Sequence, residues 1–331
     1  MPVTIYDLAR EAGVSISTVS KALNDSYTIS EQTKRMILET AQRLHYKPNA
    51  RARSFARQKS GTVIFATELY RNVAFENPHL FEILTGITRS LEKKGYAVML
   101  KPMEKGSATG YLRECMQERM ADGVMIHAGL LSRELAAFLS HAETPYLVIG
   151  RPDFSCNICW MDVNHELAGS VAASYLLDKG YRSILYLTGR PEDAISQSRL
   201  RGIVGALQEE ALAVDVLYGD TPFSEDAEKL KQRLAGPERP QVALCANNRI
   251  ALECLQCAAQ LGLRVPEEMG VMTFDHYPFS HLLRPRLTAI EVDMYDMGWE
   301  AARFLLQKIK NPNLQTQSFC TVPKLIERES T

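Results

Sequence analysis

Two cysteine pairs are the first groups in this sequence whose types and spacing suggest chemistry. Cys156 and Cys159, and then Cys254 and Cys257, have the CxxC spacing of metal-binding or redox pairs. However, 94 residues separate the two pairs, whereas the pairs of a structural zinc site usually lie roughly 15 to 20 residues apart. Cys254 and Cys257 also fall in a stretch with helical spacing, which places two small apolar side chains on one face. We therefore expect reduced thiols, no metal and no cofactor.

Motifs of common enzymes are missing from the sequence. His165 and Glu166 are followed by Leu-Ala-Gly and so do not form the HExxH motif of zinc proteases. The sequence also contains no GxGxxG after an apolar run, no P-loop and no GxSxG elbow. We therefore expect no enzymatic activity, and an α/β enzyme without a DNA role is the first alternative.

Polar residues that directly follow apolar runs are candidates for binding a small molecule. Asn247 follows the run Val242–Ala246, and Asp275 follows Gly270–Phe274. Ligands of parallel α/β sheets bind at the carboxyl ends of the strands, where such residues lie. Amide and carboxylate groups can hydrogen-bond several hydroxyls, as a sugar or sugar acid requires. The alternative for each residue is a strand-end cap or a surface ion pair.

Further candidates of lower rank share a position at the end of an apolar run, at a helix start, or on an apolar surface that can stack on a sugar ring. They are His79, Leu80, His127, Arg151, Trp160 and Phe223. Arg151 would alternatively bind across an interface between subdomains, and the two aromatic residues would alternatively belong to the core.

The elements that position these residues alternate regularly after Thr62. Short apolar runs are separated by stretches of 10 to 16 residues with helical spacing, such as Leu80–Lys94 and Leu167–Lys179. The runs are Val63–Ala66, Ala97–Leu100, Gly123–Ile126, Tyr146–Ile149, Ile184–Leu187, Val242–Ala246 and Gly270–Phe274. This alternation predicts parallel sheets with crossover helices.

The length of 331 residues exceeds the roughly 250 to 300 residues at which single cores stop growing. We expect a helix-turn-helix domain over 1–46 and a hinge over 47–60. The α/β core then has two doubly wound parallel-sheet subdomains, the first starting near Gly61 and the second near Asp162.

Residues 4 to 46 read as three short amphipathic helices. Thr4, Ser15 and Ser30 are N-cap residues in front of apolar residues with 3, 4 spacing. Only Gly13, Val14 and Ser15 connect the first two helices, which is the length of a helix-turn-helix connection. We therefore predict an all-α DNA-binding domain at the N-terminus.

The net charge of −1 conceals a basic N-terminal segment. Residues 1–60 carry 10 Lys and Arg against 5 Asp and Glu, whereas the remaining residues carry 28 against 34. Six of the ten cations lie between Arg43 and Lys59. This distribution favours a DNA-binding arm on an acidic core. The segment after Leu44 is either a solvated basic linker or a helix that folds when DNA neutralises it.

These residues resemble the LacI/GalR family of bacterial transcription regulators, which includes sugar- and purine-responsive repressors. The resemblance rests on TIYDLAREAGVSISTVSKALND and SEQTKRMILETAQRLHYKPNARARSFA near the N-terminus. It continues through RLRG, ALCANNRIAL, GVMTFDHYPFSHLLRPRLTAI and VPKLIERES, and so covers nearly the whole chain. The resemblance implies a core of periplasmic-binding-protein type, whose first subdomain covers 61–161 and about 292–320. The second subdomain covers 162–291 and about 321–331, and the resemblance implies that it binds effector and dimerises.

The family mechanism implies a homodimer that places two helix-turn-helix units in the major grooves of a pseudo-palindromic operator. Ile16, Ser17 and Lys21 match the family's base-reading positions. Thr18, Ser20, Thr4 and Tyr6 contact phosphate or cap helices. Lys21 stands where many relatives have Arg, so the selection of guanine is less certain.

The family's hinge helix lies in the minor groove between the two reading units. Phe55 occupies the position of the intercalating apolar side chain, and Ala52, Arg53 and Asn49 accompany it. Phe55 would alternatively pack on the core. We expect Phe55→Ala to weaken operator binding without changing effector affinity, as a gel shift would measure.

The family's effector binds between the two core subdomains, and Arg199 matches a family ligand position. Asn248 and His276 stand where relatives often have Asp, which leaves the effector's identity open. We expect a repressor of a carbohydrate operon whose allosteric effector is a sugar, sugar phosphate or sugar acid.

Two further alternatives remain beside the enzyme. A periplasmic sugar-binding protein would need a signal peptide, and the N-terminus MPVTIYDLAR shows none. A nucleoid protein without effector would not need so large a core. We expect a homodimer, because no heptad tail follows VPKLIERES. We expect it to be cytoplasmic with no membrane partner, because the sequence shows no signal peptide and no apolar run near the roughly 18 residues of a membrane span.

Overall fold

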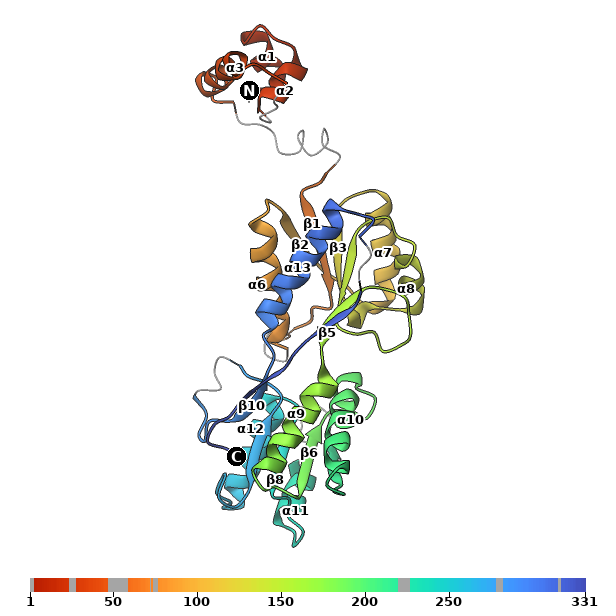
Figure 1. Cartoon of the computed structure of the whole chain (residues 1–331), viewed down its shortest axis with the longest axis vertical. Helices are drawn as coiled ribbons and strands as arrows, with labels where there is room; N and C mark the ends of the chain where they lie inside the picture. The colour runs from red at the N-terminus through yellow and green to blue at the C-terminus, as the bar shows by residue number, and fades with distance from the viewer. Residues whose placement is uncertain are drawn as a thin grey trace. The chain divides into compact units, whose positions relative to one another are not determined.

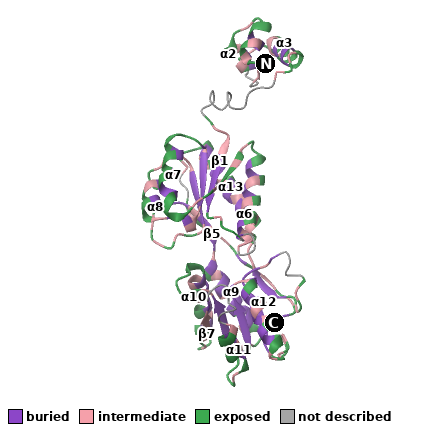
Figure 2. Ribbon diagram, turned by 180° about the vertical axis from the view of Figure 1, so that it is seen from behind, coloured by how far each residue is buried: buried purple, intermediate pink, exposed green. Residues whose placement is uncertain are grey.

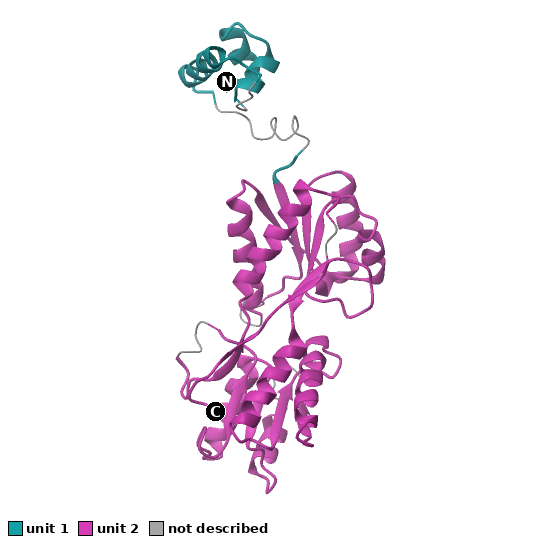
Figure 3. Cartoon of the chain, viewed as in Figure 1, with its two compact units in different colours: residues 1–61 teal, residues 62–331 magenta. Residues whose placement is uncertain are grey.

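The computed structural model describes residues 3–23, 28–46, 59–71, 73, 77–219, 227–277, 282–314 and 317–331. Contacts divide the chain into two compact units, Met1–Gly61 and Thr62–Thr331 (Figure 3). Each unit has its own buried apolar residues.

The first unit is helical. Its elements are α1 (Ile5–Glu11), α2 (Ile16–Leu23) and α3 (Glu31–Arg43). Thr4 and Asp7 form a reciprocal capping box at the start of α1, and Ser30 accepts from the Thr33 amide at the start of α3. Gly13 ends the first helix with φ of +66°, a left-handed conformation that glycine adopts without strain. These local signals produce the predicted helix-turn-helix.

A small core holds the three helices together. Leu8 and Ala9 of α1 pack with Val19 and Ala22 of α2, and α3 contributes two further residues. Leu8 and Val19 are fully buried. The spacing of these residues leaves one face of each helix for the core and the opposite face for solvent.

The first lobe of the second unit contains a parallel sheet with strand order β11-β5-β4-β3-β1-β2. Its strands are β1 (Thr62–Thr67), β2 (Ala97–Pro102), β3 (Gly123–His127), β4 (Tyr146–Ile149), β5 (Trp160–Val163) and β11 (Phe319–Thr321). Its helices are α6 (His79–Glu92), α7 (Lys105–Gln117), η1 (Ala128–Leu130), α8 (Arg133–Leu139) and α13 (Met294–Lys310). The helices α6 and α13 lie together on one face, and α7 and α8 on the other (Figure 1).

The second lobe contains a sheet with strand order β12-β10-β9-β8-β6-β7. Its strands are β6 (Ile184–Thr188), β7 (Val214–Tyr218), β8 (Val242–Cys245), β9 (Gly270–Thr273), β10 (Thr288–Glu291) and β12 (Lys324–Ile326). Its helices are α9 (His165–Asp178), α10 (Ala194–Gln208), α11 (Ala227–Ala235) and α12 (Asn248–Gln260). The central strands of both sheets are buried, while the outer helix faces are exposed (Figure 2).

The chain passes between the lobes after β5, after β10 and after β11. Strand β5 belongs to the first sheet and is followed by α9 of the second lobe, whereas β10 is followed by α13 of the first lobe. Residues far apart in the sequence therefore meet where the two lobes face each other.

The predicted fold class is confirmed, and all seven apolar runs form strands. Strands β5, β7, β10, β11 and β12 were not predicted, because they are short or only partly buried. One edge of the second sheet is antiparallel, since β12 runs antiparallel to β10.

The second CxxC pair lies on one helix of the second lobe. Cys254 and Cys257 lie in α12, where both thiols are buried in the core, and all seven cysteines are free. Within the described ranges, no group of three or more His, Cys, Asp or Glu side chains is placed to hold a metal. None of the described helices has the length and apolar character that a membrane span requires.

Candidate functional site

The outward face of α2 carries the three predicted base readers. Ile16, Ser17 and Lys21 are exposed, whereas Val19 and Ala22 of the same helix are buried. Ile16 is 39% exposed, although it is a large apolar residue at the start of the helix. An apolar side chain beside hydroxyl and ammonium donors can contact a thymine methyl while its neighbours bond base edges.

The other DNA candidates of this unit divide into caps and surface residues. Ser15 accepts from the Thr18 amide at 3.1 Å and shares a second hydrogen bond with the Thr18 hydroxyl at 2.8 Å. Thr4 is the N-cap of α1, and its hydrogen bonds lower the pKa of the Asp7 carboxyl. Tyr6 is 66% exposed and Ser20 is half-buried. Thr4 therefore caps α1, whereas Thr18 donates to the capping residue Ser15 at the start of α2.

The predicted hinge residues lie outside the described part of the chain. They are Asn49, Ala52, Arg53 and Phe55. Phe223, an effector candidate, also lies outside the described residues.

A cavity of about 440 Å³ lies between the two lobes of the second unit. The first lobe contributes the start of α6 and the segments that follow β3 and β4, and the second contributes the start of α10 and the end of β9. Six predicted effector residues line it. They are His79, Leu80, His127, Arg151, Arg199 and Asp275. Such a cavity is large enough for a small polar ligand.

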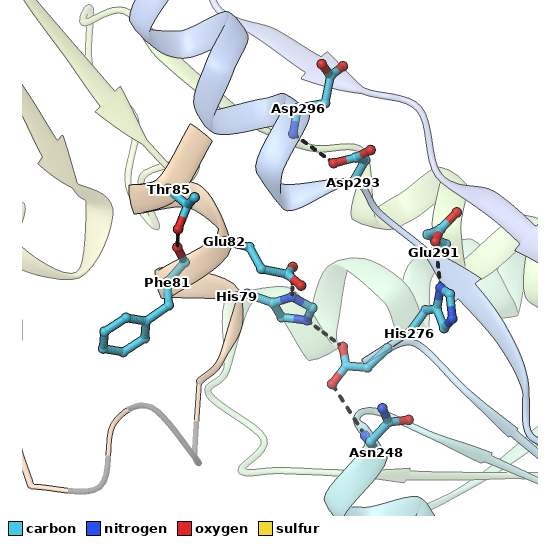
Figure 4. Close-up of polar contacts among 10 residues, drawn as sticks. His79, Phe81, Glu82, Thr85, Asn248, His276, Glu291, Asp293 and Asp296 are labelled. Carbon is cyan, nitrogen blue, oxygen red and sulfur yellow. Dashed lines mark hydrogen bonds and ion pairs between the residues drawn. The ribbon is translucent and has the colours of Figure 1, made fainter. Parts of the chain in front are cut away.

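Asp275 is the most completely buried carboxylate of this cavity. Its Oδ1 lies 3.1 Å from Nε2 of His79, and the amide of Asn248 donates to Oδ2 at 3.3 Å (Figure 4). Burial by itself would raise the pKa of Asp275, but the hydrogen bond and charge of His79, together with Arg199, lower it. The carboxylate is therefore ionised and held by one side chain from the opposite lobe.

Arg199 lies in the second turn of α10 and points across the end of β8. Its Nη1 donates to the carbonyl of Ala246 at 2.8 Å, and its guanidinium lies 4.5 Å from the ring centroid of Phe274. Its Nε is buried without a hydrogen-bond partner among the described residues. A buried N–H group without a partner costs free energy, so this atom is a natural donor to a ligand oxygen.

The wall at the end of β5 is formed by Asp162 and His165. Asp162 accepts from the amides of Arg151 and Val163, both at 2.8 Å, and lies 3.5 Å from Nε2 of His165. Burial would raise the pKa of Asp162, but the hydrogen bond of His165 and those two amides lower it. This ionised carboxylate fixes the loop that carries Arg151 into the cavity.

His127 faces the same cavity as a neutral ring. Its Nδ1 accepts from the Gly129 amide at 3.3 Å, so that the proton resides on Nε2. Burial lowers the pKa of His127 more than the nearby carboxylates raise it. The His127 ring is therefore uncharged, and its Nε2 can donate a hydrogen bond.

Two predicted effector residues do not line the cavity. The side chain of Asn247 accepts from the Ile250 amide at 2.9 Å and is the N-cap of α12, which is the strand-end cap we gave as the alternative. Trp160 is half-buried among core residues, and its ring lies 5.5 Å from the guanidinium of Arg151. It therefore supports Arg151 instead of facing a ligand.

Other residues that line the cavity were not predicted from the sequence. Asp162 lies in β5, a four-residue strand that the apolar runs did not reveal, and His165 begins α9 two residues after that strand. Met294 and Met297 come from α13, which follows β10 into the first lobe. The N-cap signal of Asn164 before α9 was the available sequence clue to this position.

Comparisons with protein families match both parts of the chain. Residues 4–49 match the model described as bacterial regulatory proteins, lacI family, and residues 173–331 match the periplasmic binding protein-like domain. The chain is 30% identical over 337 residues to catabolite control protein A of Priestia megaterium, covering 100% of both chains. It is 29% identical to the ribose operon repressor of Escherichia coli strain K12, covering 99% of both chains.

A similar solved structure agrees over the same length. The lac repressor dimer bound to operator and the anti-inducer ONPF superposes with a TM-score of 0.82 at 23% identity. The match covers 100% of this chain and 99% of that chain. It supports the architecture of a helical N-terminal unit followed by two α/β lobes.

Proposed function

Because this chain belongs to the LacI family of bacterial regulatory proteins, which are DNA-binding repressors with an effector domain and not enzymes, we propose that it represses a carbohydrate-utilisation operon. A small sugar-like effector would bind between the lobes and change operator affinity. The observation that carries this proposal is the cavity at the carboxyl ends of the neighbouring strands β8 and β9. Asp275 follows β9, and Arg199 reaches from α10 to the carbonyl of Ala246, which follows β8. The proposal places this activity in the cytoplasm, where the operator is.

The proposed reading of DNA uses the exposed face of α2. Ile16, Ser17 and Lys21 would contact base edges in the major groove, and Tyr6 and Ser20 would contact the backbone. Thr4 and Thr18 would hold the helix starts that approach phosphate. We also assign Asn49, Ala52, Arg53 and Phe55 to the minor groove, on the sequence resemblance alone.

The proposed effector is a polyhydroxylated molecule. Asp275 would accept from hydroxyl groups, and Arg199 Nε and His127 Nε2 would donate to oxygen atoms. Phe274 and Ile83 supply apolar surface in the same cavity for the CH face of a sugar ring. Alternating donors, acceptors and apolar surface favour a sugar, a sugar acid or a sugar phosphate over an apolar ligand.

We propose a homodimer as the DNA-binding form. Strand β2 is the edge of the first sheet, and Met99 and Leu100 on it are 40% and 36% exposed. Phe81 on the adjacent helix α6 is 42% exposed. An exposed apolar strand edge favours association with a second copy, which a two-fold operator also needs. This surface belongs to the first lobe, whereas the family resemblance led us to expect dimerisation through the second. Light scattering should give a dimer, and a stable monomer would contradict this.

The decisive experiment joins effector binding to DNA binding. Operators are first selected from fragmented genomic DNA with the full-length protein. Thermal shift is then measured with D-ribose, D-galactose, D-glucose, D-gluconate, glucose 6-phosphate and hypoxanthine. A ligand at one hundred times its Kd stabilises the protein by about 2.7 kcal/mol. The sugar that binds should change operator affinity by about 5-fold to 150-fold.

Two variants in one helix provide the matched control. Arg199→Gln should abolish the thermal shift. Arg201→Gln should leave it unchanged, since the Arg201 side chain is 58% exposed, lies 3.6 Å from Glu166 and does not line this cavity. Stabilisation by hypoxanthine alone would contradict the sugar assignment. Stabilisation by a sugar with no change in operator affinity would contradict its role as effector.

A further inference from the structure

The carboxylate that the effector needs is already bound by a side chain of the opposite lobe. His79 is the first residue of α6 in the first lobe, and Asp275 follows β9 in the second. Their side chains are 19% and 6% exposed, and 3.1 Å separates Nε2 from Oδ1. This contact joins residues 196 positions apart and bridges the two lobes directly (Figure 4).

The surroundings of His79 stabilise its charged form. Glu82 on α6 lies 3.6 Å from Nδ1, so that the ring stands between two carboxylates from different lobes. The ring of Tyr277 packs edge-on against it, with 4.9 Å between the centroids. Arg199 is the facing cation from α10, and it acts on Asp275 as well. Two acidic neighbours therefore flank the imidazole, and the nearest fixed cation binds elsewhere, to the Ala246 carbonyl.

We propose that His79 is a specificity-determining residue of the effector cavity, whose imidazolium occupies Asp275 in place of the effector and holds the two lobes together when the cavity is empty. This inference rests on the proposed function, because it takes the cavity to be the effector site. An effector must then offer Asp275 donors that compete with a tethered cation. Ligands that cannot donate to Asp275 leave the bridge intact and are rejected.

The bridge depends on pH in a defined direction. Burial lowers the pKa of His79, but the hydrogen bonds and charges of Asp275 and Glu82 outweigh it and raise this pKa from 6.5 to about 9. A group whose pKa is raised in the bridged form stabilises that form fully below its ordinary pKa. The stabilisation is lost as pH rises through the higher value. The bridge should therefore be complete at pH 6.5 and weak at pH 10.

The first test follows His79 itself in the ligand-free, full-length protein. Histidine labelled with ¹³C and ¹⁵N allows the ring to be titrated by NMR, and its signal is assigned by its loss in His79→Gln. We expect the His79 ring to titrate near pH 9 in the native protein and at least one pH unit lower in Asp275→Asn. Titration near 6.5 in the native protein, or no change in Asp275→Asn, would overturn the proposal.

The second test measures whether the bridge holds the lobes. Small-angle X-ray scattering gives the radius of gyration at pH 7 and at pH 10, with circular dichroism confirming that the protein stays folded. The native protein should be more compact at pH 7 than at pH 10. His79→Gln should show the larger radius at both values, because the glutamine amide carries no charge. His141→Gln, which changes an exposed histidine, should behave as the native protein does.

The outcomes separate this proposal from the proposed function. If His79→Gln has the native radius at pH 7, the bridge does not hold the lobes, and the proposal is wrong. Operator binding and the response to sugars are measured independently and would be unaffected by that result. If His79→Gln does not fold, the His79 signal is assigned by its shift in Asp275→Asn, and the NMR titration and scattering of the native protein across the same pH range still decide the question.

Discussion

The crossing of α9 and α10 offers the sharpest test of how the fold positions the effector cavity. The helices touch at Gly169 and Gly202, where no side chain fits between them. A Cβ atom on Gly202 would lie 1.9 Å from the carbonyl oxygen of Glu166 and 2.7 Å from the amide nitrogen of Ser170. Both of these atoms belong to the backbone and cannot rotate away, so Gly202→Ala forces the two helices apart.

A second glycine in α10 provides the reference from which the destabilisation by Gly202→Ala can be estimated. A Cβ on Gly205 meets no atom within 4 Å, so Gly205→Ala should gain about 0.5 to 1 kcal/mol from the higher helix propensity of alanine. Gly202→Ala has the same propensity gain but adds an overpacking cost of about 1 to 3 kcal/mol. The difference between the two variants therefore isolates the steric cost.

Differential scanning calorimetry of the two variants measures this difference. For a domain of this size, about 1 kcal/mol corresponds to about 2 to 4 °C in Tm. Gly202→Ala should melt below Gly205→Ala by about 2 to 12 °C. It should also weaken the thermal shift caused by the sugar, because Arg199 lies one turn before Gly202 in α10. Equal melting temperatures would refute the argument that this crossing is sterically tight.

Three further predictions concern the N-terminal helical unit and the cavity. Lys21→Gln should weaken binding to the selected operator by about 1 to 3 kcal/mol in fluorescence anisotropy, and an unchanged Kd would exclude Lys21 from base reading. Thr4→Ala removes the capping box of α1 and should cost the first unit about 1 kcal/mol, seen as a lower Tm of its calorimetric transition. Because the folded-state pKa of Asp162 is lowered, its stabilisation is present above its ordinary pKa of 3.8 and is lost as pH falls. Asp162→Asn should therefore lose stability at pH 7 and differ little from the native protein near pH 2, whereas a constant difference at both pH values would contradict this.

The N-terminal helical unit, with α1, α2 and α3, shows how much structure local sequence signals can predict. Thr4, Ser15 and Ser30 cap the helices they were expected to cap, and Gly13 has the positive φ that the turn was expected to need. Each of the three caps joins residues three positions apart. Local interactions of this kind can be recognised from spacing alone.

The cavity contains residues whose position local sequence signals did not predict. Asn247 follows a strand as an effector residue should, yet its carboxamide caps α12, because the same position at a strand end is also a helix start. Asp162 and His165 were missed because β5 has four residues with an alternating pattern of burial. A short strand of this kind gives too little apolar signal to be recognised in the sequence.

The sequence by itself determined the family, the reader with its capped helices, and the alternation of strands and helices in the core, because these depend on local spacing and on motifs. Only the tertiary structure decided which polar residues share the cavity. His79 and Asp275 are 196 positions apart, and they meet because the chain passes between the lobes and brings α6 against the end of β9. Once they meet in a buried site, two carboxylates raise the pKa of an imidazole to about 9. That charge state depends on the distance between the groups and on their burial, and neither can be deduced from spacing along the sequence.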